Sequence, residues 1–534
     1  MSSNDTEEYI ATLTAGDEFK GLFRRYGLRY RWYAVIAIVS GNIAAVLAST
    51  IINVAIPSIM GAFGIGQEEA QWLSTANLAA CTIAMLCGSW CVQAVGLRGT
   101  VFWMMVLFLA GSVLGGLAAN PEVMIVARVL QGIPAGLLMP LSITIIFQVF
   151  PSGKQGVAMG ISAIGIVLAP AVGPALGGLA VDMFSWRYVF FFGIPFSLFT
   201  MVLAVFFLPG RALKQALPAF DTLGLGLLIV AVTALLIALS NGERDGWSSD
   251  FIVSLFCLFA VFAALFAYRQ LVCSHPLLNL TLFLQRQFLV MSAIGFLFGA
   301  GLYASTYLVP LFLQLVQHMS PTEAGALLMP AGFVMVLIFP LSGRLADLMD
   351  LRLIMTVGVG FFAFSFSLMA GAGAGTSFWT FACWVMISRV GIGLVMPALQ
   401  MGALQGIEPR HLTQASGAFS FIRQMGGVFG VNLSSVFLDH RTSFHFQALA
   451  DTQRYDNGLT TSSLLMLERY ATSLGHVGVE SWNMALLQLG LLVQAEALIV
   501  GFRDSFMILA AVFIATLVPV WLLRSKHPTA KSAI

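Results

Sequence analysis

The feature that most constrains this chain is a series of apolar runs, each close to the length needed to cross a lipid bilayer. A helix rises about 1.5 Å per residue, so roughly 20 apolar residues span a hydrocarbon core of about 30 Å. Such runs recur along most of the 534 residues, and only 9% of the residues are charged, whereas soluble domains carry roughly 25%. The sequence therefore predicts an all-α polytopic membrane protein and excludes a soluble globule.

Charged residues and Gly/Pro clusters divide the apolar sequence into fourteen predicted transmembrane helices. Eight of them cover 32–59, 70–92, 101–118, 123–150, 156–181, 188–208, 222–240 and 251–268, and six others begin near Phe288, Ala324, Leu353, Phe378, Leu412 and Asp504. With the amino terminus inside, seventeen of the 26 Lys and Arg residues lie on cytoplasmic segments, six on external ones and three within spans. This bias follows the positive-inside rule and predicts that both termini are cytoplasmic.

Two pairs of short sequences repeat at nearly the same separation. SWCVQAVGLR (89–98) returns as GRLADLMDLR (343–352), and GLLMP (136–140) returns as GLVMP (393–397). We interpret the repeat as two six-helix halves with two inserted helices, a 6+2+6 arrangement. Halves of this kind hold a substrate cavity at their interface and alternate its access by rocking.

The repeat predicts a division of the chain into five parts. They are an amino-terminal arm (1–31), a six-helix half (32–210), two inserted helices with a linker (211–287), a second half (288–523) and a tail (524–534). The second half includes an external loop, 438–503, whose apolar segment MALLQLGLLVQAEALIV can lie on the bilayer surface or pack on the protein. Partner docking and a plain lid both fit this loop.

These motifs, taken in order, resemble the major facilitator superfamily and, within it, the fourteen-span drug:proton antiporter branch of the EmrB/QacA type. ARVLQGIPAG (127–136) resembles the fourth-span motif, and GIVLAPAVGPALGG (165–178) resembles the fifth-span antiporter motif. The resemblance implies a major facilitator fold in a bacterial inner membrane and efflux of amphiphilic substrates against protons. It also implies a periplasmic adaptor and an outer-membrane channel as further partners.

The two loop sequences resemble the superfamily's cytoplasmic gate signature. The predicted gate residues are Gln93, Gly96 and Arg98 in the first copy, and Gly343, Asp347 and Arg352 in the second. Gln93 stands at the acidic position of the first copy, which is therefore degraded. We expect Asp347 to form a latch with Arg344 or Arg352 that breaks when the inner gate opens.

The fifth-span stretch is rich in glycine and proline. Glycines let neighbouring helices approach closely, and each proline removes a backbone donor and bends the helix. We therefore predict a kinked, tightly packed seam, and the resemblance implies that the seam seals the cavity during antiport. Its predicted residues are Gly165, Gly173, Pro174, Gly177 and Gly178.

Three arginines, Arg128, Arg389 and Arg423, lie within spans. A charge at such a depth costs about 2.5–3.5 kcal/mol on insertion scales, so each should face the interior and have a partner. We predict that they serve proton coupling or charge sensing, and the resemblance links Arg128 to proton transfer. For Arg128, a structural role with bonds to backbone carbonyls is as well supported.

The first span lacks the acid that the antiporter branch carries. LASTIINVAIP (47–57) matches the branch pattern except that Ala48 stands at the acidic position. Glu323 is the nearest replacement, but SPTE (320–323) is typical of a capping box at a helix start, which we favour over a proton carrier. Embedded arginines without embedded acids predict a positive pathway and favour neutral or anionic substrates.

Several polar residues of the spans can donate or accept hydrogen bonds in the substrate cavity. The predicted cavity residues are Asn53, Asn77, Gln131, Tyr303, Tyr307 and Gln314. Methionine and phenylalanine, 24 and 43 residues, can supply adaptable apolar walls.

Other chemistries lack their residues in this sequence. We find no G-x-x-x-x-G-K-[ST], H-E-x-x-H or G-x-S-x-G, which argues against ATP-driven transport and the commonest hydrolases, and we expect no enzyme activity, cofactor or metal. The net charge of +2 does not suggest nucleic acid. A uniporter or importer without proton coupling, and a non-transporting membrane sensor or scaffold, remain as alternatives.

Overall fold

Helices are the only regular secondary structure among the described residues of the computed structural model, which are 7, 9–11, 13, 17–151, 153–211, 219–454 and 456–523. The α-helices are α2 (Asp17–Tyr26), α3 (Tyr30–Phe63), α4 (Gln67–Gly116), α5 (Pro121–Val149), α6 (Gln155–Met183), α7 (Ile194–Phe207), α8 (Thr222–Asp245), α9 (Asp250–Val272), α10 (Arg286–Leu315), α11 (Pro321–Leu348), α12 (Leu351–Met369), α13 (Phe378–Leu404), α14 (Leu412–Thr452), α15 (Gly458–Ser473) and α16 (Val479–Leu522). Short 3-10 turns are η1 (Gly27–Arg29), η2 (Trp186–Phe191), η3 (Leu280–Leu284) and η4 (Pro409–His411).

Eleven helical stretches of the described chain are long and apolar enough to cross a membrane. Large apolar side chains face outward on them, such as Phe333 and Leu337 of α11, which are 65% and 74% exposed. The predicted run 70–92 and all but the last two residues of the run 101–118 lie in α4, where Gly96 has a non-helical conformation. An apolar surface of this extent is what a bilayer covers.

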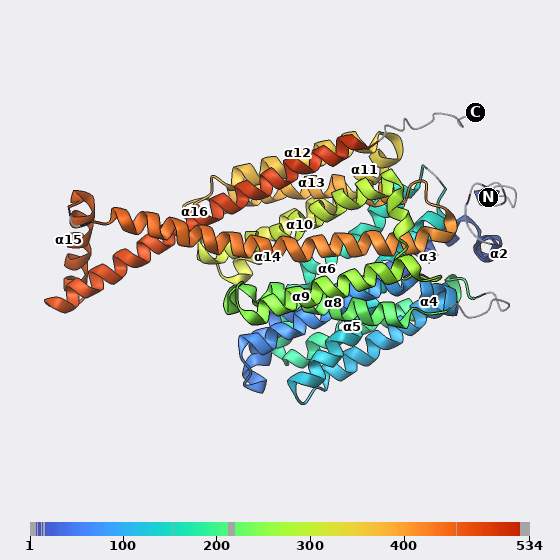
Figure 1. Cartoon of the computed structure of the whole chain (residues 1–534), viewed down its shortest axis with the longest axis horizontal. Coiled ribbons are helices and arrows are strands. Elements are labelled where there is room, and N and C mark those ends of the chain that lie inside the picture. The colour runs from blue at the N-terminus through green and yellow to red at the C-terminus, as the bar shows by residue number, and fades with distance from the viewer. Residues whose placement is uncertain are drawn as a thin grey trace.

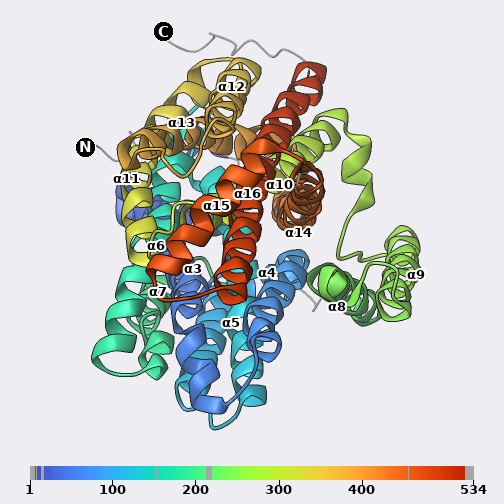
Figure 2. The ribbon, with the colours of Figure 1, turned by 90° about the vertical axis from the view of Figure 1, so that its left-hand side faces the viewer.

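The helices form two groups that face each other, with a third pair at the side. In Figure 2, α3 to α7 lie in the lower part and α10 to α13 in the upper part, and α8 and α9 stand beside α4 and α14. Helix α6 packs on both α3 and α11, and α14 packs on α4 and α5 as well as on α10. These contacts join the two halves that the repeat predicts.

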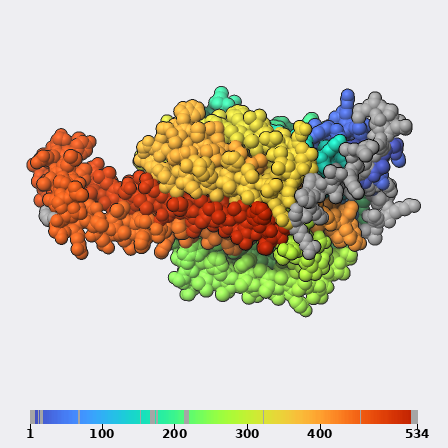
Figure 3. Space-filling model, turned by 90° about the horizontal axis from the view of Figure 1, so that it is seen from above, coloured from blue at the N-terminus to red at the C-terminus, as the bar shows by residue number. Residues whose placement is uncertain are grey.

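The two sides of the helical body differ in shape. Helix α3 begins and α16 ends on one side, which we call the terminal side, while α14, α15 and α16 project from the opposite side as a long hairpin (Figure 1). Figure 3 shows the hairpin reaching well beyond the rest of the molecule. We call that side the hairpin side.

The hairpin differs from the loop that we predict for 438–503. Helix α14 continues to Thr452, and α16 begins at Val479, so MALLQLGLLVQAEALIV is part of a continuous helix. No glycine or proline stands between 431 and 454 to stop α14, and polar residues that cannot enter lipid remain compatible with a helix in water. The apolar segment therefore belongs to the projecting hairpin, where Leu487, Leu491 and Leu492 are exposed.

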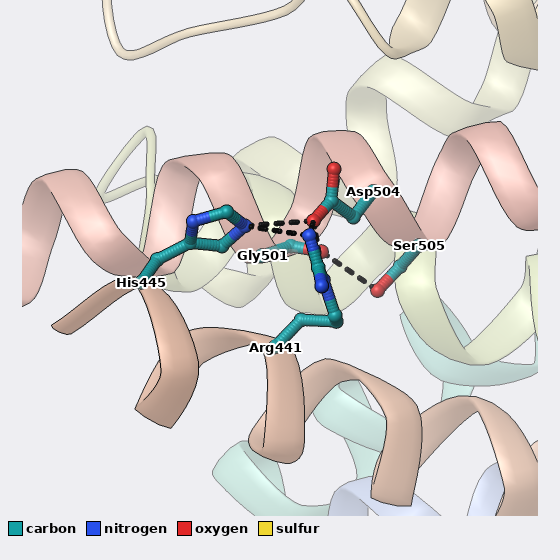
Figure 4. A network of polar contacts seen from close by, with 5 residues as sticks. All are labelled: Arg441, His445, Gly501, Asp504 and Ser505. Carbon is teal, nitrogen blue, oxygen red and sulfur yellow. Dashed lines mark hydrogen bonds and ion pairs between the residues drawn. The ribbon is translucent and has the colours of Figure 1, made fainter. Parts of the chain in front are cut away.

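An ionic cluster holds the two long helices together at the base of the hairpin (Figure 4). Arg441 Nε of α14 donates to Asp504 Oδ2 of α16 at 2.6 Å, and His445 Nε2 lies 2.7 Å from the same oxygen. Nearby, Arg503 Nε donates to the carbonyl of Ala372 in the α12–α13 connection at 3.1 Å. The two hairpin helices are thus joined to each other, and α16 is also joined to the α12–α13 connection of the body.

A buried carboxylate fixes the inserted helices α8 and α9. Asp221, the N-cap of α8, accepts hydrogen bonds from Gly224 N, Arg269 Nε and Gln270 Nε2, each at 3.0 Å. Burial alone would raise the pKa of Asp221, but these hydrogen bonds outweigh it and hold the pKa below its usual value. The inserted pair is therefore joined at its terminal-side end by a fully bonded anion.

Candidate functional site

A small cavity lies between the two halves. Its walls come from α5 and α6 of the first half and from α11 and α13 of the second, through Met139, Ser142, Ile143, Ile146, Met159, Ser162, Ala163, Phe339, Met396, Pro397 and Gln400. Its volume is about 40 Å³, far below the roughly 300–1,000 Å³ of a ligand pocket. In this conformation the interface is closed around the site, and a larger molecule needs the halves to separate.

The repeated sequences supply equivalent walls of this cavity. Met139 belongs to GLLMP and Met396 occupies the same place in GLVMP, and both line the cavity. Methionine is unbranched and flexible, so paired methionines suit a wall that must adapt to different shapes. None of the six predicted cavity residues lines this cavity, whereas the repeat itself would have indicated it.

Asp347 joins the halves on the terminal side. Its two carboxylate oxygens accept hydrogen bonds from the first-turn amides of α6, Gly156 N at 2.9 Å and Val157 N at 3.1 Å. The amino-terminal end of a helix attracts negative charge, because its first amides lack partners within the helix and its dipole is positive there. Asp347 thus latches α11 to α6.

The partner of this latch differs from the one that we expect. Asp347 bonds to backbone amides, not to Arg344 or Arg352, and Arg352 Nε has no hydrogen-bond partner among the described residues. Gly343 and Gly156 also touch, and a Cβ on Gly343 would lie 2.1 Å from Gly156 O. Only glycine permits the two helices to come this close.

Helix α14 closes the same side from the second half. Ser416 Oγ donates to Pro140 O of α5 at 3.0 Å and lies 2.9 Å from Thr144 Oγ1. A Cβ on Gly417 would lie 2.5 Å from Met85 O of α4. The halves therefore meet at two places on the terminal side, α6 with α11 and α14 with α4 and α5.

The first gate copy lies within one half. Gly96 has φ 75° and its Cβ would lie 2.6 Å from Arg211 N, while Arg98 Nε donates to Leu208 O at 2.8 Å. Gln93 Nε2 donates to Ser89 Oγ at 3.1 Å and lines a second cavity, of about 250 Å³, near the start of α14. Gln93 does not reproduce the carboxylate contact that Asp347 makes.

The glycines of the fifth-span motif lie along α3. A Cβ would come within 2.9 Å of Val39 at Gly165, 2.6 Å of Thr50 at Gly173, and 2.8 Å of Ile51 at Gly177. Gly178 has more room, with Val54 at 3.9 Å. Helices α3 and α6 can therefore approach closely because these positions of α6 are glycines. The side chain of Pro174 lies outside the described part of α6.

Arg128 is buried, and its guanidinium donates three hydrogen bonds. Its Nε donates to Leu73 O at 3.1 Å, and its Nη1 donates to Ala48 O at 3.2 Å and to Gln131 Oε1 at 2.9 Å. Two predicted cavity residues belong to this network, since Asn77 Nδ2 donates to Arg128 O and Gln131 Nε2 donates to Ser112 Oγ. The network joins α3, α4 and α5 and corresponds to the structural role considered above.

Arg423 is equally buried but poorly bonded. Its side chain is 2% exposed, its Nη2 contacts Met139 Sδ at 3.3 Å, and its Nε has no hydrogen-bond partner in the described structure. Arg389 is half-buried on α13, seven and eleven residues before Met396 and Gln400, which line the cavity. Because these spacings repeat every two and three turns, Arg389 shares their face.

The other predicted cavity residues lie towards the hairpin side or outward. Tyr303 Oη donates to Gln424 Oε1 at 2.9 Å, and Tyr307 Oη lies 3.1 Å from Ser435 Oγ, so both tyrosines join α10 to α14. Asn53 and Gln314 are exposed. Glu323 confirms the capping box, because it and Ser320 bond reciprocally at the start of α11.

Comparisons with known proteins agree with this geometry. The family model of the Major Facilitator Superfamily matches residues 38–431. The chain is 27% identical over 492 residues to the multidrug export protein EmrB of Escherichia coli (strain K12), covering 91% of this chain and 94% of EmrB. It is 26% identical over 482 residues, 89% of each chain, to the uncharacterized MFS-type transporter YhcA of Bacillus subtilis (strain 168).

Solved structures show the same fold at low sequence identity. The human organic anion transporter MFSD10 matches with a TM-score of 0.58 and 13% identity over 92% of this chain and 99% of its own. The proton:xylose symporter XylE matches with a TM-score of 0.59 and 13% identity over 93% and 96%. With two helical halves closed over a central cavity and a family match over most of its length, the chain belongs to the Major Facilitator Superfamily of membrane transporters.

Proposed function

We propose that this transporter exports amphiphilic small molecules by rocking its two halves about the central cavity, driven by proton entry. The observation on which the proposal rests is the cavity between Met139 and Met396, closed on one side by the Asp347 latch and by Ser416. Such contacts break and re-form when access alternates. The similarity to EmrB, a multidrug export protein, supports export as the direction.

The arrangement in the membrane follows from the same proposal. We propose fourteen spans in a 6+2+6 order, with α8 and α9 inserted between the halves 32–210 and 288–523, and a terminal side that lies in the cytoplasm of a bacterial cell. The α14–α16 hairpin then stands in the periplasm. Its exposed apolar side chains, such as Met466 and Val477 (74% and 77% exposed), offer a surface for the periplasmic adaptor that an EmrB-type pump implies.

Neutral or anionic substrates fit the site better than lone cations. The described lining of the cavity contains no acid. Arg423 contacts Met139 of this lining, and Arg389 lies on the face of α13 that carries Met396 and Gln400. A cation entering this region meets positive charge without a compensating carboxylate. Methionine, isoleucine and phenylalanine side chains bind the apolar part of the substrate.

Protons have a candidate entry point on the hairpin side. Two carboxyl groups, Glu243 of α8 and Asp439 of α14, lie next to each other there, and carboxyl groups are side chains that carry protons in membrane transporters. Ser435, one turn before Asp439, contacts Tyr307 of α10. This pair replaces, in our proposal, the acid that Ala48 removes from the first span.

Everted membrane vesicles test this function. An acid interior should drive accumulation of amphiphilic probes, and collapsing the gradient should stop it. Gly343→Leu is the matched control and should not accumulate the probes. A Cβ at 2.1 Å from Gly156 O prevents closure of the gate, while the residues that line the cavity are unchanged. Accumulation that continues unchanged after the gradient collapses would favour the uniporter alternative, which Ala48 at the acidic position supports.

A further inference from the structure

The buried arginine of α14 has a charge that its surroundings do not match. Arg423 and Arg128 are both nearly inaccessible, at 2% and 1% exposed. Arg128 bonds to two backbone carbonyls and one side-chain oxygen, whereas Arg423 contacts a thioether and leaves its Nε without a partner in the described structure. A thioether sulfur is a weak acceptor, so Arg423 retains the capacity to bind an oxygen ligand.

No carboxylate takes this place among the described side chains near Arg423. The titratable groups that interact with it are Tyr303 of α10 and Cys81 of α4, and the Tyr303 hydroxyl already donates to Gln424. Ser420, one turn before Arg423 on α14, is fully buried, and its hydroxyl also has no hydrogen-bond partner among the described residues. Residues three apart share a helix face, so Ser420 and Arg423 present two sets of unused donors together.

The position of Met139 connects this cation to the transport cavity. Met139 touches the guanidinium on one side and lines the central cavity on the other. It belongs to α5 of the first half, and Arg423 belongs to α14 of the second. The adjacent Pro140 accepts the Ser416 hydrogen bond that closes the terminal side, so opening that side must also pull Met139 away from Arg423.

We propose that Arg423 is the receptor for the acidic group of an exported amphiphile, covered by Met139 in the closed state and uncovered when the halves part. This inference rests on the proposed export function. The planar guanidinium binds carboxylate, sulfonate or phosphate oxygens through two parallel hydrogen bonds, and Ser420 adds a third donor. The apolar body of the same molecule lies against the methionine and isoleucine side chains of the cavity.

A matched pair of probes isolates the acidic group. 8-Anilinonaphthalene-1-sulfonate and N-phenyl-1-naphthylamine share one aromatic body and differ by the sulfonate. Binding to the purified full chain in nanodiscs, and uptake by everted vesicles, are measured for both probes. Arg423→Gln should weaken sulfonate binding by tenfold or more and leave the neutral probe within twofold, and Arg423→Lys, which keeps the charge but not the fork, should fall between.

Two further variants test the cover and the fold. Asp347→Asn, which loosens the closed gate, should raise sulfonate affinity about 30-fold or more while the open state is still rare, and should not raise it in Arg423→Gln, because more of the population then exposes the receptor. Met139→Leu removes the sulfur contact at nearly constant volume and should raise sulfonate affinity relative to neutral-probe affinity, because the guanidinium then has no sulfur contact to give up. The melting temperature of each variant verifies that the chain is folded.

The outcomes separate the two proposals. Sulfonate affinity that is unchanged in Arg423→Gln, while the neutral probe is still exported, overturns the receptor and leaves the export function standing. Sulfonate binding that depends on Arg423, without gradient-driven uptake of either probe, supports the receptor and overturns export.

Discussion

Asp347→Asn should open the terminal-side gate without disturbing the rest of the fold. In the parent chain the carboxylate accepts two amide hydrogen bonds, at 2.9 and 3.1 Å, from the first turn of the 29-residue helix α6. Asparagine keeps one acceptor oxygen, but its NH₂ group faces an amide that also donates. The substitution therefore removes one charge-assisted bond and the attraction between the anion and the helix end.

The magnitude follows from these two losses. A hydrogen bond to a charged group contributes about 1.5–3 kcal/mol, and a charge at a helix end contributes about 0.3–1 kcal/mol. We expect the closed state to lose about 2–4 kcal/mol relative to the open state. Since each 1.36 kcal/mol is about tenfold, the open population rises roughly 30- to 900-fold.

Thiol labelling measures this population. Ser162 lines the central cavity and is 6% exposed, so a cysteine placed there, in a chain without its six native cysteines, reacts mainly when the gate opens. The labelling rate should rise by the same factor until opening is no longer rare. Asp350→Asn is the matched control, because it removes the same charge three residues later but caps α12, where asparagine caps equally well. Equal labelling rates in Asp347→Asn and the parent would refute the latch, as would equal acceleration by Asp350→Asn.

Three other changes have defined outcomes. Arg128→Gln leaves buried carbonyls of α3 and α4 without their donor and should lower the free energy of unfolding by about 3 kcal/mol. The measurements are a lower melting temperature and a loss of uptake of charged and neutral probes alike. An unchanged melting temperature would contradict the structural role of Arg128. Gly177→Ala places a Cβ 2.8 Å from Ile51 and should impair transport, whereas Gly178→Ala, with 3.9 Å of room, should not; equal transport rates in the two variants would show that the seam does not depend on close approach. Asp221→Asn should destabilise the inserted helices by about 1.5–3 kcal/mol at pH 7. The pKa of Asp221 is lowered in the folded chain. The stabilisation that the Asp221 carboxylate provides is therefore present above the unfolded pKa, near 3.8, and is lost as the pH falls through the lower folded pKa. A difference in melting temperature between parent and variant that is the same at pH 3 as at pH 7 would contradict this.

Features encoded by neighbouring residues were accessible from the sequence. The capping box at Ser320 and Glu323 is a local pattern, and the structure forms it as predicted. The repeated GLLMP and GLVMP mark the two methionines that line the cavity from opposite halves, because equivalent positions of two related halves lie near their shared axis. The lengths of the apolar runs alone were sufficient to predict a protein of membrane-spanning helices.

Features that depend on distant residues were not accessible. Asp347 bonds to backbone amides 190 and 191 residues away. Every residue except proline has a backbone N–H, so the sequence does not single out these donors, whereas the nearby arginines are visible in it as charged partners. Asn77 and Gln131 have the chemistry of cavity residues, but Arg128 engages both. The hairpin was predicted as a loop because charges interrupt the apolar run after 438, although nothing there breaks a helix.

Helix α14 runs without interruption through both ends of the transporter. Its 41 residues, about 60 Å at 1.5 Å per residue, carry Ser416 and Arg423 near one end and Arg441 and His445 towards the other. Because α14 is this long, a tilt of a few degrees at its terminal-side contacts would move the tip of the hairpin by several ångströms. A protein clamped to that tip would feel each transport cycle as a mechanical stroke, and holding the tip still would brake the pump from outside the membrane.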